Sequence, residues 1–211
     1  MEYAQPFAGA DSRFSRFCLE LIYDRRGKRA AQLKAVSQPK RTLLVENRHM
    51  DWKTYINETY KKAEYEDFEL TPIYSEPANL ESIEIVEEKL GIEFHDELRS
   101  LLLETNGIRE WMKTDKWEGE TGYLVFSLDK IEEENLYIRS LDVNRDNYMP
   151  FENLLFIAPA GNGDLFGYSI NNGQIRRSDI FVWNHEDDSR VNVAPSLKRF
   201  LELLKSGNIK Y

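Results

Sequence analysis

Cysteine is nearly absent from this chain of 211 residues, which contains only Cys18. A single cysteine excludes an intramolecular disulfide framework and any cysteine-rich zinc module. Long apolar runs are also absent, because the longest stretches have four or five residues, whereas a membrane helix needs roughly 20. Near the N-terminus, Glu20 interrupts the apolar run Phe17-Cys18-Leu19 and the basic cluster follows it, which is not the order of a signal peptide. We therefore expect a soluble, cytoplasmic protein.

Charge is unevenly divided along the chain. The whole sequence carries a net charge of −9, yet residues 1–49 carry +5 and residues 50–211 carry −14. This division indicates a basic N-terminal extension on an acidic domain. The extension has a short apolar stripe that includes Cys18, and its cationic loop suits acidic partners, RNA or an anionic membrane surface. The alternative is a flexible arm or a segment outside the native product, with Met50 as a candidate start. We predict that residues 1–49 are dispensable for folding.

From residue 51 onward, apolar side chains recur with helical spacing. The first stripe consists of Trp52, Tyr55, Ile56, Tyr60 and Ala63. Prolines in Thr71-Pro72-Ile73 and Glu76-Pro77 then indicate a loop. Asn79 suits the N-cap of a second helix and Gly91 its left-handed end. A third helix follows, with Leu98, Leu101 and Leu102 facing inward, and ends at Asn106-Gly107.

The pattern after Gly107 changes to short strands separated by turn residues. The predicted strands are Tyr123–Phe126, Leu154–Ala158, Leu165–Ile170 and Ile180–Trp183. An amphipathic helix is predicted near Ile131–Leu141 and a last helix at Leu197–Leu204. Helices, a cluster of strands with short connections and a final helix indicate an α+β domain with a mainly antiparallel sheet.

The glycine-rich segment Gly161–Gly167 superficially suggests a nucleotide-binding loop. A dinucleotide fingerprint needs a helix after its glycines, because the helix N-terminus holds the pyrophosphate. Here a second strand follows, and no Lys-Ser/Thr pair is present for a phosphate-binding loop. Asn162-Gly163 is instead typical of a tight turn. We therefore predict a β-hairpin and no cofactor.

His185 lies among acidic residues in the segment Trp183–Asp188. An imidazole beside carboxylates suits metal binding or general acid–base catalysis. However, His49 and His95 are distant in sequence, whereas a catalytic metal site needs three convergent ligands. We interpret His185 as a structural residue at a strand end, hydrogen-bonded to a backbone group or a carboxylate. We predict no enzyme and no metal site.

Two tryptophans, Trp111 and Trp117, occur in a polar stretch between a helix and a strand. We interpret this stretch as a loop. Its tryptophans are either packed lids or anchors for a partner.

Five segments, in this order, resemble the SUKH superfamily, which contains the Smi/Knr-type proteins. They are Ile83–Ile92, Leu98–Gly107, Leu155–Ala158, Gly163–Tyr168 and Val182–Glu186, and the helix Leu197–Leu204 also fits. The resemblance covers about residues 50–211. His95 stands where the family usually has a proline, and residues 1–49 have no counterpart. The residues that carry the resemblance are expected to maintain the fold: Asn106, Gly107, Gly163, Asp164, Trp183, His185 and Glu186.

The resemblance implies an α+β fold in which helices pack against a curved, mainly antiparallel sheet, without an enzyme active site. Many bacterial SUKH proteins are immunity proteins that neutralise toxins, often nucleases, whereas related eukaryotic proteins are interaction scaffolds in cell-wall and signalling regulation. A charge of −14 suits immunity, because an acidic surface is attracted to the cationic groove of a nuclease. Acidic surfaces also simply keep proteins soluble.

The leading hypothesis is an immunity or inhibitor protein that binds a cognate, basic toxin. Its acidic domain is expected to bind neither nucleic acid nor a membrane. The expected contact residues are Glu132, Glu133, Glu134, Asp187, Asp188, Trp111 and Trp117. The alternative is a non-enzymatic regulatory scaffold of the Smi/Knr type. A third hypothesis is a hydrolase that uses His185 and nearby carboxylates.

Overall fold

The computed structural model describes residues 22–23, 29–30, 50–63, 65, 67–141 and 150–209. Contacts divide the chain into two units, residues 1–47 and 48–211. In the first unit, strands β1 (Ile22–Tyr23) and β2 (Arg29–Ala30) pair antiparallel. Cys18, in the apolar stripe of the extension, lies outside the described residues.

The second unit begins with α1 (Trp52–Lys62), where the sequence predicts a helix. Asp51 caps it, because its side chain accepts a hydrogen bond of 2.9 Å from the N–H of Thr54. Trp52, Ile56 and Tyr60 of the apolar stripe are buried, with Trp52 1% exposed, whereas Tyr55 and Ala63 are half-buried. This stripe fixes the face with which α1 packs on the rest of the unit.

Strand β3 (Glu69–Tyr74) corrects the predicted loop at Thr71-Pro72-Ile73. Its sheet has the order β3-β4-β5, so β3 is an edge strand, and Pro72 pairs with Glu110 of β4. An edge strand accepts proline because the missing N–H does not have to reach a neighbouring strand. Proline here therefore indicates an edge and not a break.

Helices α2 (Leu80–Leu90) and α3 (Asp96–Glu104) follow the predicted pattern. Asn79 caps α2 by accepting a hydrogen bond of 2.7 Å from the N–H of Ser82. Gly91 ends α2 in the left-handed region, with φ of 67°. Between the helices, the buried Glu87 carboxylate accepts hydrogen bonds from the N–H of Phe94 and from Arg99.

The predicted loop that carries the tryptophans is largely a hairpin. Strand β4 (Ile108–Lys113) contains Trp111, and β5 (Glu118–Val125) extends the predicted strand toward the N-terminus. Trp117 lies in the turn between them. The sequence pattern missed β4 because polar residues occupy both of its faces, including Glu110 on the face that packs against helices.

The second half of the unit forms a four-stranded antiparallel sheet with the order β6-β7-β8-β9. Its elements, with the helices around them, are α4 (Leu128–Ser140), the 3-10 helix η2 (Phe151–Asn153), β6 (Leu154–Pro159), β7 (Leu165–Ser169), β8 (Ile180–Trp183), β9 (Arg190–Ala194) and α5 (Leu197–Lys205). The glycine-rich segment is the β6–β7 hairpin, as predicted. Strand β9 was not predicted, because it contains the polar residues Arg190 and Asn192 and lacks a run of apolar residues.

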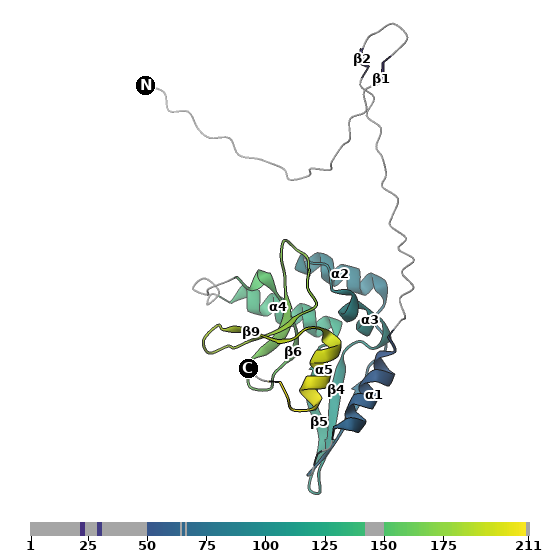
Figure 1. The fold of residues 1–211 in the computed structure, drawn as a ribbon, viewed down its shortest axis with the longest axis vertical. Coiled ribbons are helices and arrows are strands. Elements are labelled where there is room, and N and C mark those ends of the chain that lie inside the picture. Colours follow the sequence, from purple (N-terminus) through teal and green to yellow (C-terminus); the bar gives the residue numbers. More distant parts are fainter. Residues whose placement is uncertain are drawn as a thin grey trace. The chain divides into compact units, whose positions relative to one another are not determined.

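The two sheets meet where the N–H of Phe126 donates a hydrogen bond of 2.8 Å to the carbonyl of Ile157. Helix α4 packs on β6 and α2, while α5 packs on β9 and α1 (Figure 1). The predicted α+β class with antiparallel sheets is therefore confirmed. Among the described residues, no helix is long and apolar enough to cross a membrane.

Candidate partner-binding surfaces

Helix α4 is positioned by two residues of the family motif, Asn106 and Gly107. The Asn106 Oδ1 atom accepts a hydrogen bond of 2.7 Å from the N–H of Leu128, the first residue of α4. Gly107 has φ of 81°, and a Cβ atom there would lie 2.6 Å from the backbone nitrogen of Ser127. Only glycine fits this approach. The pair thus joins the end of α3 to the start of α4.

The three consecutive carboxylates expected to contact a partner lie on α4, but they differ in exposure. Glu132 pairs with Lys89 of α2 at 2.6 Å, and its side chain is 22% exposed. Glu134, also 22% exposed, pairs with Lys130 at 3.0 Å. The Glu133 side chain is 71% exposed, although it too lies 3.2 Å from Lys130. Glu133 is therefore the most accessible of the three.

Asp187 and Asp188, in the β8–β9 loop, also have different environments. The Asp188 carboxylate accepts hydrogen bonds of 2.8 Å from the indole N–H of Trp183 and from Arg190. Asp187 is exposed, and hydrogen bonds from the side chain and backbone of Ser189 lower the pKa of its carboxyl group. Asp188 therefore supports the loop, while Asp187 faces solvent.

His185 joins this loop to the β6–β7 hairpin. Its Nδ1 atom lies 2.6 Å from Asp164 Oδ1, which also accepts a hydrogen bond of 3.0 Å from the His185 backbone. Asn162 donates to the other oxygen of Asp164 at 2.9 Å. Burial tends to raise the pKa of the Asp164 carboxyl, but the hydrogen bonds from His185 and Asn162 outweigh it and lower the pKa. His185 thus has the carboxylate contact expected from the sequence, and its structural role stays a prediction.

The other motif residues of this region also have structural contacts. The Trp183 ring packs edge-on against Phe151, with centroids 5.0 Å apart, and lies tilted against Phe156, with centroids 5.6 Å apart. A Cβ atom on Gly163 would lie 3.0 Å from the His185 ring. Glu186 is exposed, and its N–H donates to the Asn184 side chain.

The two tryptophans lie on opposite faces of the β4–β5 hairpin. Trp111, 39% exposed, pairs with Glu120 across the strands, and the next residue, Met112, pairs with Gly119. A Cβ atom on Gly119 would lie 2.6 Å from the Trp117 ring, so Trp117, 50% exposed, covers the Met112 face. The two rings cannot form one common anchor.

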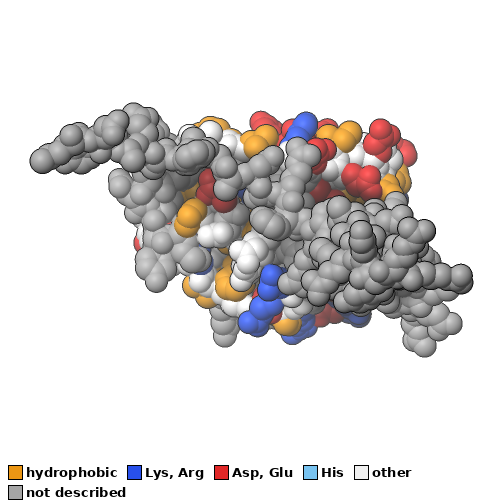
Figure 2. Space-filling model, turned by 90° about the horizontal axis from the view of Figure 1, so that it is seen from above, with side chains coloured by type: hydrophobic (Ala, Val, Ile, Leu, Met, Phe, Trp, Pro, Cys, Tyr) orange, Lys and Arg blue, Asp and Glu red, His pale blue; other side chains and the backbone are white. Residues whose placement is uncertain are grey.

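The predicted contact residues thus come from three separate elements: α4, the β8–β9 loop and the β4–β5 hairpin (Figure 1). Sequence reasoning missed two exposed apolar residues on α4, Leu136 at 43% and Tyr137 at 60%. Their spacing from Glu133 by three and four residues was the available signal. Figure 2, which views the molecule from above relative to Figure 1, shows acidic side chains beside hydrophobic ones on the described surface.

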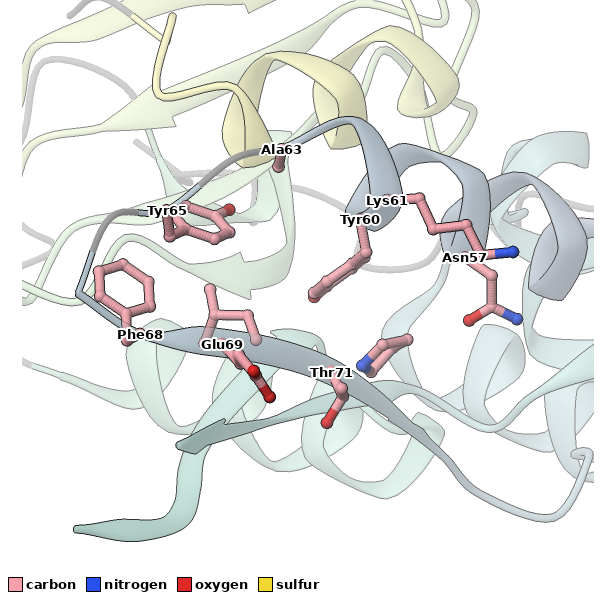
Figure 3. Close-up of a pocket in the computed structure, with 10 residues that line it drawn as sticks. Asn57, Tyr60, Lys61, Ala63, Tyr65, Phe68, Glu69 and Thr71 are labelled. Carbon is pink, nitrogen blue, oxygen red and sulfur yellow. The ribbon is translucent and has the colours of Figure 1, made fainter. Parts of the chain in front are cut away.

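An aromatic groove of about 670 Å³ separates α1 from β3 (Figure 3). Tyr60, Tyr65 and Phe68 line it, with the Tyr65 and Phe68 rings stacked at 4.6 Å. Polar residues at the groove are Asn57, Lys61, Glu69 and Thr71. The groove combines apolar walls with charges of both signs.

Tyr60 also belongs to a buried polar cluster below the groove. Its hydroxyl donates a hydrogen bond of 2.5 Å to Glu110 Oε1, and the same oxygen pairs with the Lys205 ammonium. Burial raises the Tyr60 pKa, and the Glu110 carboxylate raises it further. The Tyr65 hydroxyl donates to the Lys205 carbonyl at 2.9 Å. These contacts attach α5 to β4.

Within the described part of the chain, no group of three or more histidine, cysteine, aspartate or glutamate side chains is arranged to hold a metal ion. A family model described as SMI1-KNR4 cell-wall, SUKH_6, matches residues 80–201, which is more than half of the chain. The match begins at α2 and ends within α5, so α1 and β3 precede it. No curated protein matches the chain.

Proposed function

Because the chain belongs to the SMI1-KNR4 family of the SUKH superfamily, we propose that it is an immunity protein. In this proposal it acts without catalysis, binding a basic, nuclease-type toxin stoichiometrically and blocking its active site. Residues 50–211 carry a net charge of −14. A nuclease presents a cationic groove to phosphate, and an acidic protein is steered to such a groove by long-range attraction.

The observation that carries the proposal is the combination of the family's fold with accessible carboxylates. Glu133 of α4 and Asp187 of the β8–β9 loop are exposed to solvent. Glu132, Glu134 and Asp188 have intramolecular partners. The first two residues are therefore the better candidates for contact with a cationic surface.

The test uses the toxin domain encoded next to this gene. Co-expression of the chain with that domain should restore growth of a sensitive host. In vitro, nuclease activity should fall linearly and reach zero at one equivalent of the chain, and the affinity should weaken as salt rises. A neighbouring toxin domain that neither binds the chain nor is inhibited by it would refute the proposal.

The alternative proposal is a regulatory scaffold, which the family description "cell-wall" favours. The two proposals predict different neighbouring genes. A large toxin gene next to this one supports immunity. Without such a neighbour, the scaffold is the better proposal, and isolation of tagged chain with its bound proteins from the native cell should then recover regulatory or cell-wall proteins.

The hydrolase hypothesis predicts that His185→Ala abolishes a hydrolytic activity and leaves the thermal midpoint unchanged. The contact between His185 and Asp164 supports the opposite outcome. Loss of this side-chain hydrogen bond should lower the midpoint of thermal unfolding, with a cost of about 1 kcal/mol, because the buried carboxylate keeps its hydrogen bonds from the residue-185 backbone and from Asn162. Unchanged stability together with lost hydrolysis would favour the hydrolase.

A further inference from the structure

The outer face of α4 is the helix surface formed by Asp129, Glu133, Leu136, Tyr137 and Ser140. These residues recur at helical spacing and are all exposed. The inner face of the same helix is buried, with Leu128, Ile131, Asn135 and Ile138 directed into the domain. Tyr137 has the highest exposed fraction, 60%, among the large hydrophobic residues described as exposed. Tyrosine is enriched among interface hot spots, and Leu136, 43% exposed, adds apolar surface to the same helix face.

The charge around this face favours a basic partner. Helices α2 and α4 pack together and contain eight acidic side chains against three basic ones, a net charge of −5. All three cations have intramolecular partners. Lys89 pairs with Glu132, Lys130 pairs with Glu133 and Glu134, and Arg139 donates to the carbonyls of Leu90 and Leu154. Because the same pairs engage Glu132, Glu133 and Glu134, it is the excess of carboxylates over cations that keeps this surface negative.

The other candidate surfaces have less suitable charge. The tip of the β4–β5 hairpin presents Lys113 and Lys116 beside its acidic residues, and its two tryptophans face opposite ways. The groove between α1 and β3 has Lys61 and Glu69 at its rim. Both surfaces therefore place lysines beside their aromatic side chains, and these lysines would repel a basic partner.

We infer that the outer face of α4 is the surface that contacts the basic toxin, with Tyr137 and Leu136 as apolar anchors and with Asp129 and Glu133 as the flanking charges. This inference rests on the proposed function and assigns its interface. Tyr137 and Leu136 supply the buried centre of the contact, and the carboxylates steer the cationic partner toward it.

The test measures binding of the full chain to the neighbouring toxin domain, made catalytically inactive. Tyr137→Ala should weaken the affinity about thirtyfold and Leu136→Ala about tenfold, as hot-spot truncations do. The matched control is Val191→Ala, which removes an apolar side chain on β9 with the same exposure as Leu136, 43%, and should change affinity less than about twofold. Alanine is favourable in an exposed helix, so thermal unfolding should confirm that the α4 variants fold.

A second pair of variants tests the charges. Asp129→Lys with Glu133→Lys should slow association about tenfold at low salt and reduce its salt dependence. The control, Asp115→Lys with Glu118→Lys, reverses two exposed carboxylates of the hairpin and should have a small effect.

The outcomes separate the interface from the function. If the wild-type chain binds the toxin and the α4 variants bind equally well, the interface is wrong and the immunity proposal stands. If the wild-type chain does not bind the toxin, both are wrong. Self-association that Tyr137→Ala abolishes, or binding of an RNA oligonucleotide or of anionic vesicles that depends on Tyr137, would also overturn the inference.

Discussion

The four-stranded sheet is packed mainly with apolar side chains, whereas the three-stranded sheet is tied to a helix by a buried ion pair. In the first, all but the last residue of β6 is buried, and Phe166 of β7 packs edge-on against Phe200 of α5 at 4.9 Å. In the second, Glu110 of β4 meets Lys205 and Tyr60. Apolar packing needs only volume and shape, but a buried charge needs a specific partner. The two sheets should therefore respond differently to mutation.

The largest effect is expected in the four-stranded sheet. Phe166 is 1% exposed, so Phe166→Ala removes a full aromatic ring from the core and leaves a cavity. The free energy of unfolding should fall by about 3–5 kcal/mol, measured by urea denaturation. Trp117→Ala, at an exposed position, should change it by less than about 0.5 kcal/mol. If Phe166→Ala lowers the free energy of unfolding no more than Trp117→Ala does, the apolar packing of this sheet does not dominate the stability of the domain.

The buried ion pair should give the next largest effect. Lys205→Met removes the ammonium and leaves the largely buried Glu110 carboxylate, 15% exposed, with only the Tyr60 hydroxyl among its observed partners. The free energy of unfolding should fall by about 3 kcal/mol. The double variant Lys205→Met with Glu110→Leu removes both charges and should recover part of this loss, because the Tyr60 hydroxyl then lacks its acceptor. If the double variant is as unstable as the single one, packing and not charge holds the three-stranded sheet.

The contact between Asp164 and His185, at the β6–β7 hairpin, should make the free energy of unfolding fall at acid pH. Asp164 is 2% exposed, and its pKa is lower in the folded chain than its ordinary value. A lowered pKa stabilises the fold above the ordinary value near pH 4, and this contribution is lost as pH falls through the folded pKa. Asp164→Asn should cost about 1–3 kcal/mol at pH 7.

The pH profile provides the check. The stability difference between wild type and Asp164→Asn should shrink as pH falls below about 4. Asp115→Asn, at an exposed turn position, should leave stability nearly unchanged at every pH. A difference that stays constant with pH would show that the variant acts through packing and not through the charge of Asp164.

Deletion of residues 1–49 should have the smallest effect on either sheet. All strands of the two sheets lie within residues 69–194. We predict that residues 50–211 unfold with a free energy within about 0.5 kcal/mol of the full chain, and that limited proteolysis leaves a core beginning near Met50. Unfolding of the trimmed chain would show that the extension is an integral part of the domain.

Most helices and the apolar strands could be predicted from the sequence. Asn79 and Gly91 mark the ends of α2 through local backbone chemistry, and the continuous apolar run of β6 is typical of a buried strand. Strands β4 and β9 could not be recognised in this way. Glu110 of β4 is half-buried against partners distant in sequence, and β9 exposes Val191 and Asn192 at a sheet edge.

The candidate interface was predicted less completely. Sequence reasoning selected Glu132, Glu133 and Glu134 as equals, but α2 supplies Lys89 to pair with Glu132. It also selected Asp188, which supports its own loop. Tyr137 and Leu136 were overlooked, because a helical stripe shows which residues face together but not which stripe other elements cover. The contact role of these residues stays a prediction.

The sequence by itself determined the family, the α+β class, the separation of charge between residues 1–49 and 50–211, and the ends of α2. These properties depend on composition or on residues within a few positions of one another. Only the tertiary structure decided which charges are paired and which apolar groups are exposed. Glu110 and Lys205 are 95 residues apart, and Asp164 and His185 are 21 apart. Pairing and burial depend on such distant neighbours, which are brought together by folding.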